Sequence, residues 1–224
     1  MIDRPSGRLG RLLMSLTART AVVAVLTLLV STSGAARADA RVEVPEKDAG
    51  HGDLPLAATR IVGYAEVHAH IGTKNPSIDE IYLRTLYRHY LELCRLEGVN
   101  MAVAIAQMIH ETDYLRFTGA VRAVQYNYAG LGATGGGNPG LSFADMRSGV
   151  AAHVQHIKAY ANDEPLETRL VDPRFHLVRR GSAPTVRTLT GQWATDPEYD
   201  EKLSAHLTAL LRNSAEVGAA ATGR

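Results

Sequence analysis

The chain has 224 residues, with 24 Lys or Arg, 23 Asp or Glu, and a single cysteine, Cys94. This length is enough for one good core with terminal extensions. One cysteine excludes an internal disulfide and a cysteine-cluster metal site, so the expected fold is held together by packing alone.

The first 38 residues show the three parts of a secretory signal peptide. The positive n-region holds four arginines: Arg4, Arg8, Arg11 and Arg19. A short apolar run at 21–30 precedes an A-x-A-type cleavage site at 36–38. The run is too short for a standard transmembrane helix, although an uncleaved anchor stays open. We therefore expect export to the periplasm or the cell exterior, with no stable membrane insertion after cleavage.

Cleavage after Ala38 would change the charge balance. It would remove five Arg and one Asp, leaving 19 basic and 22 acidic residues and a net charge of −3. A nucleic-acid-binding domain would need a basic face, so nucleic acid is excluded as the main partner.

Three segments are predicted beyond the signal. Residues 39–60 are rich in charge, Pro, Gly and Ala without a sustained period, which is typical of a linker. Residues 61–212 form a single domain, and 213–224 form an Ala- and Gly-rich disordered tail. Within the domain, Ser77 and Glu80 have capping-box spacing before a helix over 78–97, which Gly98 would end.

The next predicted helix starts at Asn100, a plausible N-cap, and reaches about Tyr114. Its first residues are apolar all round, which is typical of a core helix. Gln107 and Glu111 are four residues apart and share a face. Glu111 thus lies at the end of a buried helix, where a carboxyl is costly to ionise and its pKa rises into the range of a general acid. The alternative is a solvated glutamate, or one paired with an arginine.

A glycine-rich segment follows at 117–143 and excludes a long helix there. Alternation around Val121, Ala123 and Gln125 predicts a short strand or hairpin arm. Long glycine-rich segments inside compact domains are usually functional loops. This one does not match a phosphate-binding loop, because no lysine follows its glycines.

The remaining elements are also helical. Helices are predicted over 144–161 and 184–189, and Asp196 and Pro197 would start the last one. That helix carries four leucines at helical spacing: Leu203, Leu207, Leu210 and Leu211. The chain is therefore expected to fold as a mainly helical single domain with one glycine-rich excursion.

Four segments resemble the glucosaminidase domain of bacterial peptidoglycan hydrolases, glycoside hydrolase family 73. They are EGVNMAVAIAQMIHET at 97–112, NYAGLGATG at 127–135, GVAAHVQHIKAYA at 149–161 and WATDPEYDEKL at 193–203. Their order and spacing are those of the family, over about 61–211. The resemblance implies a mainly α (α+β), lysozyme-like fold with a short Gly-rich loop or hairpin beside the active-site helix. It also implies hydrolysis at N-acetylglucosamine in peptidoglycan glycan strands, with no cofactor, by what we expect to be a monomer.

The resemblance assigns roles to individual residues. Glu111 matches the catalytic acid, and Tyr199 matches a tyrosine that holds a water or the acetamido group of the substrate. Asn127 and Gly130 match an N-x-x-G motif that shapes the groove. The candidate substrate-binding residues, which include aromatic side chains able to stack on sugars or to pack in the core, are Gln107, Tyr126, Asn127, Tyr128, Gly130 and Trp193.

The chain departs from the family at the second acidic residue, which many members carry on a hairpin after the N-x-x-G motif. Residues 132–143 contain no Asp or Glu, and Asp145, the next carboxylate, is expected to cap a helix. Two carboxyls about 5–5.5 Å apart imply retention of configuration, and about 6.5–9.5 Å implies inversion. With one carboxyl alone, either the 2-acetamido group assists or Tyr199 positions water.

Three alternatives stay open at this point. His110, Asp113, His153 and His156 are metal-ligand types, but the H-E-x-x-H spacing is missing and no metal is predicted. A non-catalytic glycan-binding module would use Glu111 only as a hydrogen-bond acceptor. A lytic transglycosylase would use the same glutamate and release anhydro-sugars.

Overall fold

The computed structural model describes residues 50–134 and 137–221, with side chains as far as Arg212. These residues belong to one compact unit, 45–224; the predicted signal peptide, 1–38, and residues 39–49 lie outside the description. The helices are α1 (Tyr64–Gly72), α2 (Glu80–Glu97), α3 (Met101–Glu111), α4 (Met146–Ala161) and α5 (Tyr199–Ala221). Short 3-10 turns lie at η1 (His51–Asp53), η2 (Ala123–Gln125), η3 (Phe175–Leu177) and η4 (Arg187–Leu189).

The predicted mainly helical class is confirmed. In the described part of the chain, β-pairing is limited to isolated bridges. The strand expected around 121–125 is wrong, because Ala123–Gln125 form η2 and the Gln125 side chain accepts from the Arg122 backbone N–H at 2.6 Å. No helix among the described residues is long and apolar enough to cross a membrane.

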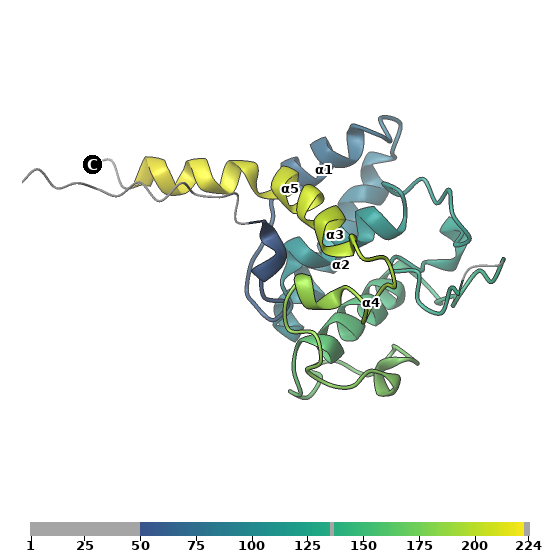
Figure 1. The fold of residues 1–224 in the computed structure, drawn as a ribbon. Coiled ribbons are helices and arrows are strands. Elements are labelled where there is room, and N and C mark those ends of the chain that lie inside the picture. Colours follow the sequence, from purple (N-terminus) through teal and green to yellow (C-terminus); the bar gives the residue numbers. More distant parts are fainter. Residues whose placement is uncertain (1–49, 135–136, 222–224) are drawn as a thin grey trace, which may run out of the picture. The chain divides into compact units, whose positions relative to one another are not determined.

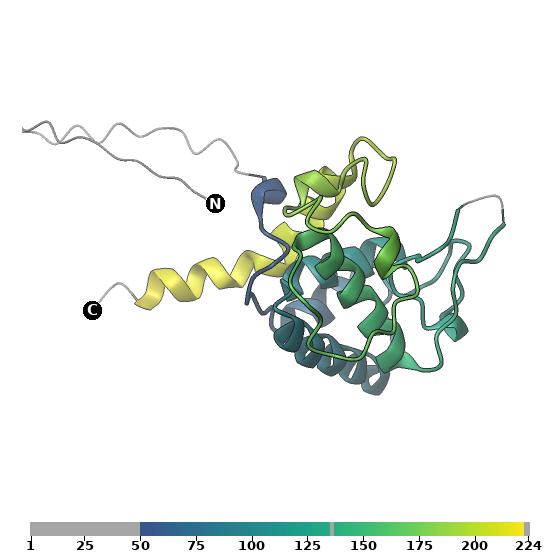
Figure 2. The same cartoon turned by 90° about the horizontal axis from the view of Figure 1, so that it is seen from below.

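Helix α3 is the centre of the core, as its apolar sequence predicts. Residues 101–109 are all buried, and α3 packs against α2, α4 and α5 (Figure 1). The Asn100 side chain caps the helix by accepting from the Ala102 N–H at 3.1 Å. The glycine-rich segment between α3 and α4 extends away from these helices in both views (Figure 1, Figure 2).

The two ends of α2 differ in how well the sequence predicts them. Gly98 ends the helix with a φ of 68°, as expected for a left-handed cap. The predicted capping box is wrong, because Asp79, two residues after Ser77, is the N-cap. Its carboxylate accepts from the Tyr82 N–H at 2.6 Å, while Glu80 pairs with Arg84.

The segment predicted as a linker is partly built into the domain. Leu56 is fully buried, its N–H donates to Pro184 O at 2.9 Å, and its carbonyl accepts from Asn100 N at 2.7 Å. The prediction of a linker is therefore wrong for residues 50–60, because the backbone of Leu56 is hydrogen-bonded to the domain and its side chain is buried in the core. Residues 39–49 lie outside the description.

The last helix begins two residues later than predicted. Pro197 and Glu198 form a turn in which the Asp196 carboxylate accepts from Glu198 N at 3.0 Å, and α5 starts at Tyr199. Its backbone remains helical to Ala221, past the predicted start of the tail at 213. Side chains from 213 onward and residues 222–224 lie outside the description, so the tail stays a prediction.

A buried ion pair joins α2 to α4. Lys158 Nζ lies 3.0 Å from Glu97 Oε2, and the two side chains are 3% and 1% exposed. Burial raises the pKa of Glu97, but hydrogen bonds from Thr168, Glu167 and Lys158 outweigh it and leave that pKa lowered. The carboxylate therefore stays charged inside the protein and depends on these partners.

Replacing Lys158 with Met should lower the free energy of unfolding by about 3–5 kcal/mol, because it strands the Glu97 charge in the interior. Urea denaturation at pH 7 measures this loss. The control is Arg147→Met, which removes a half-exposed partner of Glu92 and should cost no more than about 1 kcal/mol. Equal losses in the two variants would contradict a special role for the buried pair.

Candidate active site

Glu111 ends α3 and receives two hydrogen bonds on one oxygen. The Tyr199 hydroxyl donates to Glu111 Oε1 at 2.7 Å, and the Trp193 indole N–H donates to the same atom at 3.2 Å. Tyr199 is the first residue of α5, and Trp193 lies in the turn before it. The segment 193–199 thus brings both donors to the end of the buried helix.

The other oxygen of Glu111 faces the glycine-rich segment. A Cβ placed on Gly130 would lie 3.3 Å from Glu111 Oε2, and Gly130 has a φ of +62° that favours glycine. Because Oε1 already accepts two donors, a proton on this carboxyl is placed on Oε2. Glycine at position 130 leaves that atom open toward the adjoining pocket.

The environment favours the protonated form of Glu111. Burial raises its pKa, and the hydrogen bonds from Tyr199 and Trp193 offset only part of this effect. Burial also raises the pKa of Tyr199 well above its ordinary value, so the phenol stays a donor. These features are those of a general acid.

A chain of buried side chains holds Tyr199 in place. Gln107 Nε2 donates to the Tyr199 hydroxyl oxygen at 3.0 Å, and Gln107 Oε1 lies 3.4 Å from His153 Nε2. His153 Nδ1 lies 2.8 Å from the Tyr90 hydroxyl. Burial lowers the pKa of His153 to about 3, so the ring is neutral and carries one proton. One consistent assignment puts that proton on Nε2 and directs every donor toward Glu111.

Two predicted substrate-binding residues have other roles in this arrangement. Gln107 is fully buried behind Tyr199, so it orients that residue and does not reach a ligand. Tyr128 is also fully buried, with its hydroxyl 3.1 Å from that of Tyr82, so its ring packs in the core. Because both side chains are fully buried, neither can bind substrate directly.

The other predicted residues shape or border the site. Asn127 is fully buried; its amide donates to Leu131 O and Leu141 O, and its carbonyl oxygen accepts from Leu131 N, which folds the loop around Gly130. Tyr126 is half-buried against the core. Its backbone carbonyl meets α4 at Gly149, where a Cβ would lie 1.8 Å from the Tyr126 oxygen. The glycine-rich segment is thereby fixed against α4.

A pocket of about 430 Å³ opens in front of Glu111. This volume is in the range of ligand-binding clefts. Its lining comes from the glycine-rich segment and from the turn before α5: Glu111, Ala129, Gly130, Ala133, Thr134, Trp193, Ala194, Thr195 and Asp196. The sequence predicts only a capping role for Asp196, and the structure shows that it is also a second carboxylate of this pocket. Asp145 instead caps α4 by accepting from Ser148 N at 2.7 Å, as predicted.

The potential metal ligands are engaged elsewhere. His156 Nδ1 lies 2.6 Å from Asp172 Oδ2, Asp113 pairs with Arg116, and His153 belongs to the chain behind Tyr199. Within the ranges that the structure covers, no group of three or more His, Cys, Asp or Glu is placed to hold a metal ion.

A histidine cluster lies between α1, α3 and α5. His70 Nε2 is 3.0 Å from His206 Nδ1, and the His110 ring centre is 5.8 Å from that of His206 and 5.5 Å from that of Tyr199. Burial lowers the pKa of all three histidines, to about 4 for His206. Nearby Arg212 and Lys202 lower the pKa of His70 and His110 further, whereas Asp196 raises that of His110.

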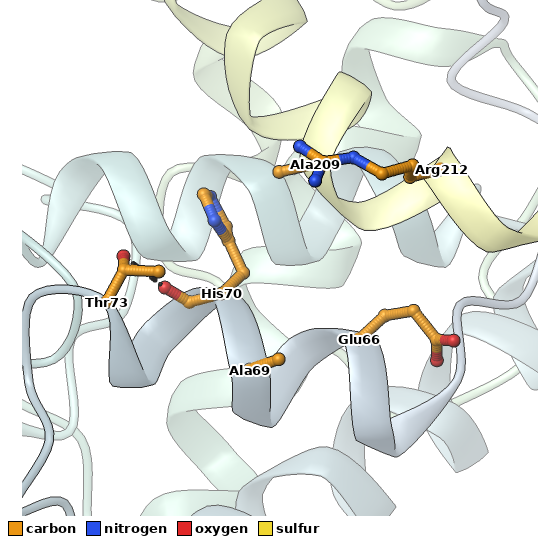
Figure 3. Close-up of a pocket in the computed structure, with 6 residues that line it drawn as sticks. All are labelled: Glu66, Ala69, His70, Thr73, Ala209 and Arg212. Atoms are coloured by element: carbon orange, nitrogen blue, oxygen red, sulfur yellow. Dashed lines mark hydrogen bonds between the residues drawn. The ribbon is translucent and has the colours of Figure 1, made fainter.

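Beside this cluster, α1 and α5 enclose a pocket of about 210 Å³ (Figure 3). The His70 ring is directed from α1 toward α5, where Arg212 lies. Glu66 and Arg212 bring opposite charges to this pocket, and no predicted site residue lines it. We therefore assign the candidate active site to the Glu111 pocket.

Acid should destabilise the protein through these histidines. They are neutral when folded and protonate near pH 6.5 when unfolded, so the unfolded state binds more protons. The contribution of neutral His206 to folding stability should be fully present above pH 6.5 and should be lost as the pH falls to about 4. The slope should be about 1.4 kcal/mol per pH unit for each such histidine. Urea denaturation from pH 7 to pH 4 measures it. His206→Gln should flatten the profile and exposed His176→Gln should not; an unchanged slope in His206→Gln would refute the assignment.

Comparison with known proteins identifies the family of this chain. A family model for glucosaminidases, described as mannosyl-glycoprotein endo-beta-N-acetylglucosaminidase, matches residues 87–211, more than half of the chain. An uncharacterized protein of Borreliella burgdorferi is 46% identical over 137 residues, which cover 61% of this chain and 67% of that protein. No solved structure gives a significant match. The matched range contains Glu111, Trp193 and Tyr199, and the chain belongs to the glucosaminidase family.

Proposed function

We propose that the protein is an exported peptidoglycan hydrolase that cleaves the glycosidic bond after N-acetylglucosamine, with Glu111 as its general acid. The observation that carries the proposal is the asymmetry of the Glu111 carboxyl. Two donors fix Oε1, and Oε2 faces a pocket of suitable size. Membership in the glucosaminidase family supports the choice of glycosidic bond.

In the proposed reaction, Glu111 Oε2 gives its proton to the glycosidic oxygen as that bond breaks. Positive charge then develops on the sugar ring, and the new carboxylate is stabilised by Tyr199 and Trp193. Burial keeps this proton on Glu111 before the substrate reacts, because it disfavours the free carboxylate. These two hydrogen bonds thus stabilise the negative charge that forms on Glu111 during the step.

The second half of the reaction needs a group that stabilises the sugar cation or orients water. Asp196 lines the same pocket, and hydrogen bonds from Lys202 and from the Glu198 backbone lower its pKa, so it is ionised. We propose Asp196 for this role, together with the 2-acetamido group of the substrate. Asp145 is engaged in capping α4.

Digestion of purified peptidoglycan tests the proposal. The products are reduced with borohydride and identified by mass spectrometry. N-acetylglucosaminitol at the reduced end is expected from the unmodified protein. Anhydro-sugar products would indicate lytic transglycosylation in place of hydrolysis. Glycan binding without any product would indicate a non-catalytic binding module.

A further inference from the structure

The Glu111 pocket continues into a second pocket of about 170 Å³. Both are lined by residues of the glycine-rich segment and by Trp193. The second pocket adds side chains from α4 and from the loop before η3, among them His156, Tyr160 and Arg174. The two pockets therefore form one groove, with the candidate acid in one part and Arg174 in the other.

Arg174 lines the second pocket with a positive charge, and its guanidinium has no partner among the described residues. The side chain is half-buried, yet no hydrogen bond or ion pair links its guanidinium to any residue of 50–134 or 137–212. The neighbouring Asp172 is already used, because its Oδ1 accepts from the Arg174 backbone N–H at 2.8 Å and its Oδ2 meets His156 at 2.6 Å. The backbone of Arg174 is thus fixed while its charge is left available.

Two polar side chains in or near this wall are paired within the protein. The Tyr160 hydroxyl donates to Gln192 O at 3.0 Å. Arg180, which follows η3, donates to Asn162 O and Glu164 O and lies 4.5 Å from the centre of the Phe175 ring. Among the described residues, Arg174 therefore differs from Arg180 in that its guanidinium has no hydrogen-bond or ion-pair partner, and it differs from the exposed Arg179 in that it lines the pocket. A guanidinium in this setting is suited to bind a carboxylate through two parallel hydrogen bonds.

We propose that Arg174 binds a carboxylate carried by the glycan strand, next to the bond that Glu111 acts on. This inference rests on the proposed peptidoglycan substrate. In peptidoglycan, every second sugar bears a lactyl group, whose carboxylate is either free or amide-linked to a peptide with carboxylates of its own. An arginine one pocket away from the acid would select such a strand over a neutral N-acetylglucosamine polymer.

Binding measurements separate this subsite from catalysis. They use Glu111→Gln protein, so that ligands are not cleaved, with and without Arg174→Gln. Three glycan fragments of equal length are titrated by calorimetry: one with free lactyl carboxylates, one with peptide-linked lactyl groups, and one with all carboxyls amidated. Arg174→Gln should lower the affinity for at least one carboxylate-bearing fragment about 10-fold or more. The fragment whose affinity falls identifies the source of the carboxylate. The amidated fragment should bind both proteins alike.

The matched control is Arg179→Gln, an exposed arginine shortly after η3 that lines neither part of the groove. It should leave all three affinities unchanged, and Arg174→Lys should restore part of the loss. The subsite would be overturned if Arg174→Gln left all affinities unchanged or weakened binding of the amidated fragment equally. It would also be overturned if Arg179→Gln weakened binding as much as Arg174→Gln, or if the Glu111→Gln parent bound no fragment. Binding does not depend on turnover, so the subsite can hold even if no hydrolysis is found.

Discussion

Replacing Glu111 with Gln should lower the rate of peptidoglycan hydrolysis by about 10²–10⁴-fold, the usual contribution of general acid catalysis. The amide keeps the size of the side chain, and its oxygen can still accept from Tyr199 and Trp193. An amide nitrogen would then occupy the place of Oε2, where it cannot deliver a proton to the glycosidic oxygen. The loss should therefore appear in kcat, with glycan affinity and thermal stability nearly retained.

The control for this substitution is Asp113→Asn. Asp113 lies two residues further on, pairs with Arg116 near the surface, and loses the same unit of charge when changed. Its activity should stay within about twofold of the unmodified protein, in line with the small value of surface pairs. If Glu111→Gln retained more than a tenth of the activity, Glu111 would not be the acid.

Tyr199→Phe should give the second largest effect, a fall in kcat of about 10–100-fold. The phenol donates to the Glu111 carboxylate at 2.7 Å, and a hydrogen bond to a charged group is worth about 1.5–3 kcal/mol. Without it, the carboxylate that forms when the proton leaves is less stable. The substitution also leaves the buried Gln107 amide without its acceptor, which should cost about 1–3 kcal/mol of stability.

The pH dependence of Tyr199→Phe distinguishes this role from simple loss of packing. A general acid must be protonated, so activity declines as pH rises through the pKa of Glu111. Tyr199 stabilises the ionised form and lowers that pKa, and its removal should move the alkaline limb of the rate profile to higher pH. Tyr87→Phe, which removes a hydroxyl bonded to Val62 O at 2.9 Å, is the control and should leave the limb in place. A shift of the limb to lower pH in Tyr199→Phe would contradict the account.

Local sequence signals were sufficient for the helices whose pattern is strong. The all-apolar start of α3 predicts its burial, and with it the position of Glu111 at the edge of the core. Asn100, Gly98 and Asp145 act as the caps that their residue types suggest. These features depend on nearby residues, which is why they can be read from the chain alone.

Features that depend on packing between distant segments were not predictable in this way. The chain from Tyr90 through His153 and Gln107 to Tyr199 joins four helices. No spacing in the sequence indicates that these four side chains meet. Leu56 looks like part of a linker until its backbone is paired with Pro184 and Asn100. The link between Glu111 and Tyr199, 88 residues apart, was suggested by the family resemblance and not by local pattern.

Titration of Glu111 itself tests the account most directly. Protein labelled with ¹³C at the glutamate side-chain carboxyls can be followed by NMR against pH, and Glu111→Gln identifies the resonance by its absence. We expect this carboxyl to titrate above the ordinary glutamate value of about 4.3, because burial outweighs its two hydrogen bonds. A titration at or below that value would contradict a carboxyl prepared to act as a general acid.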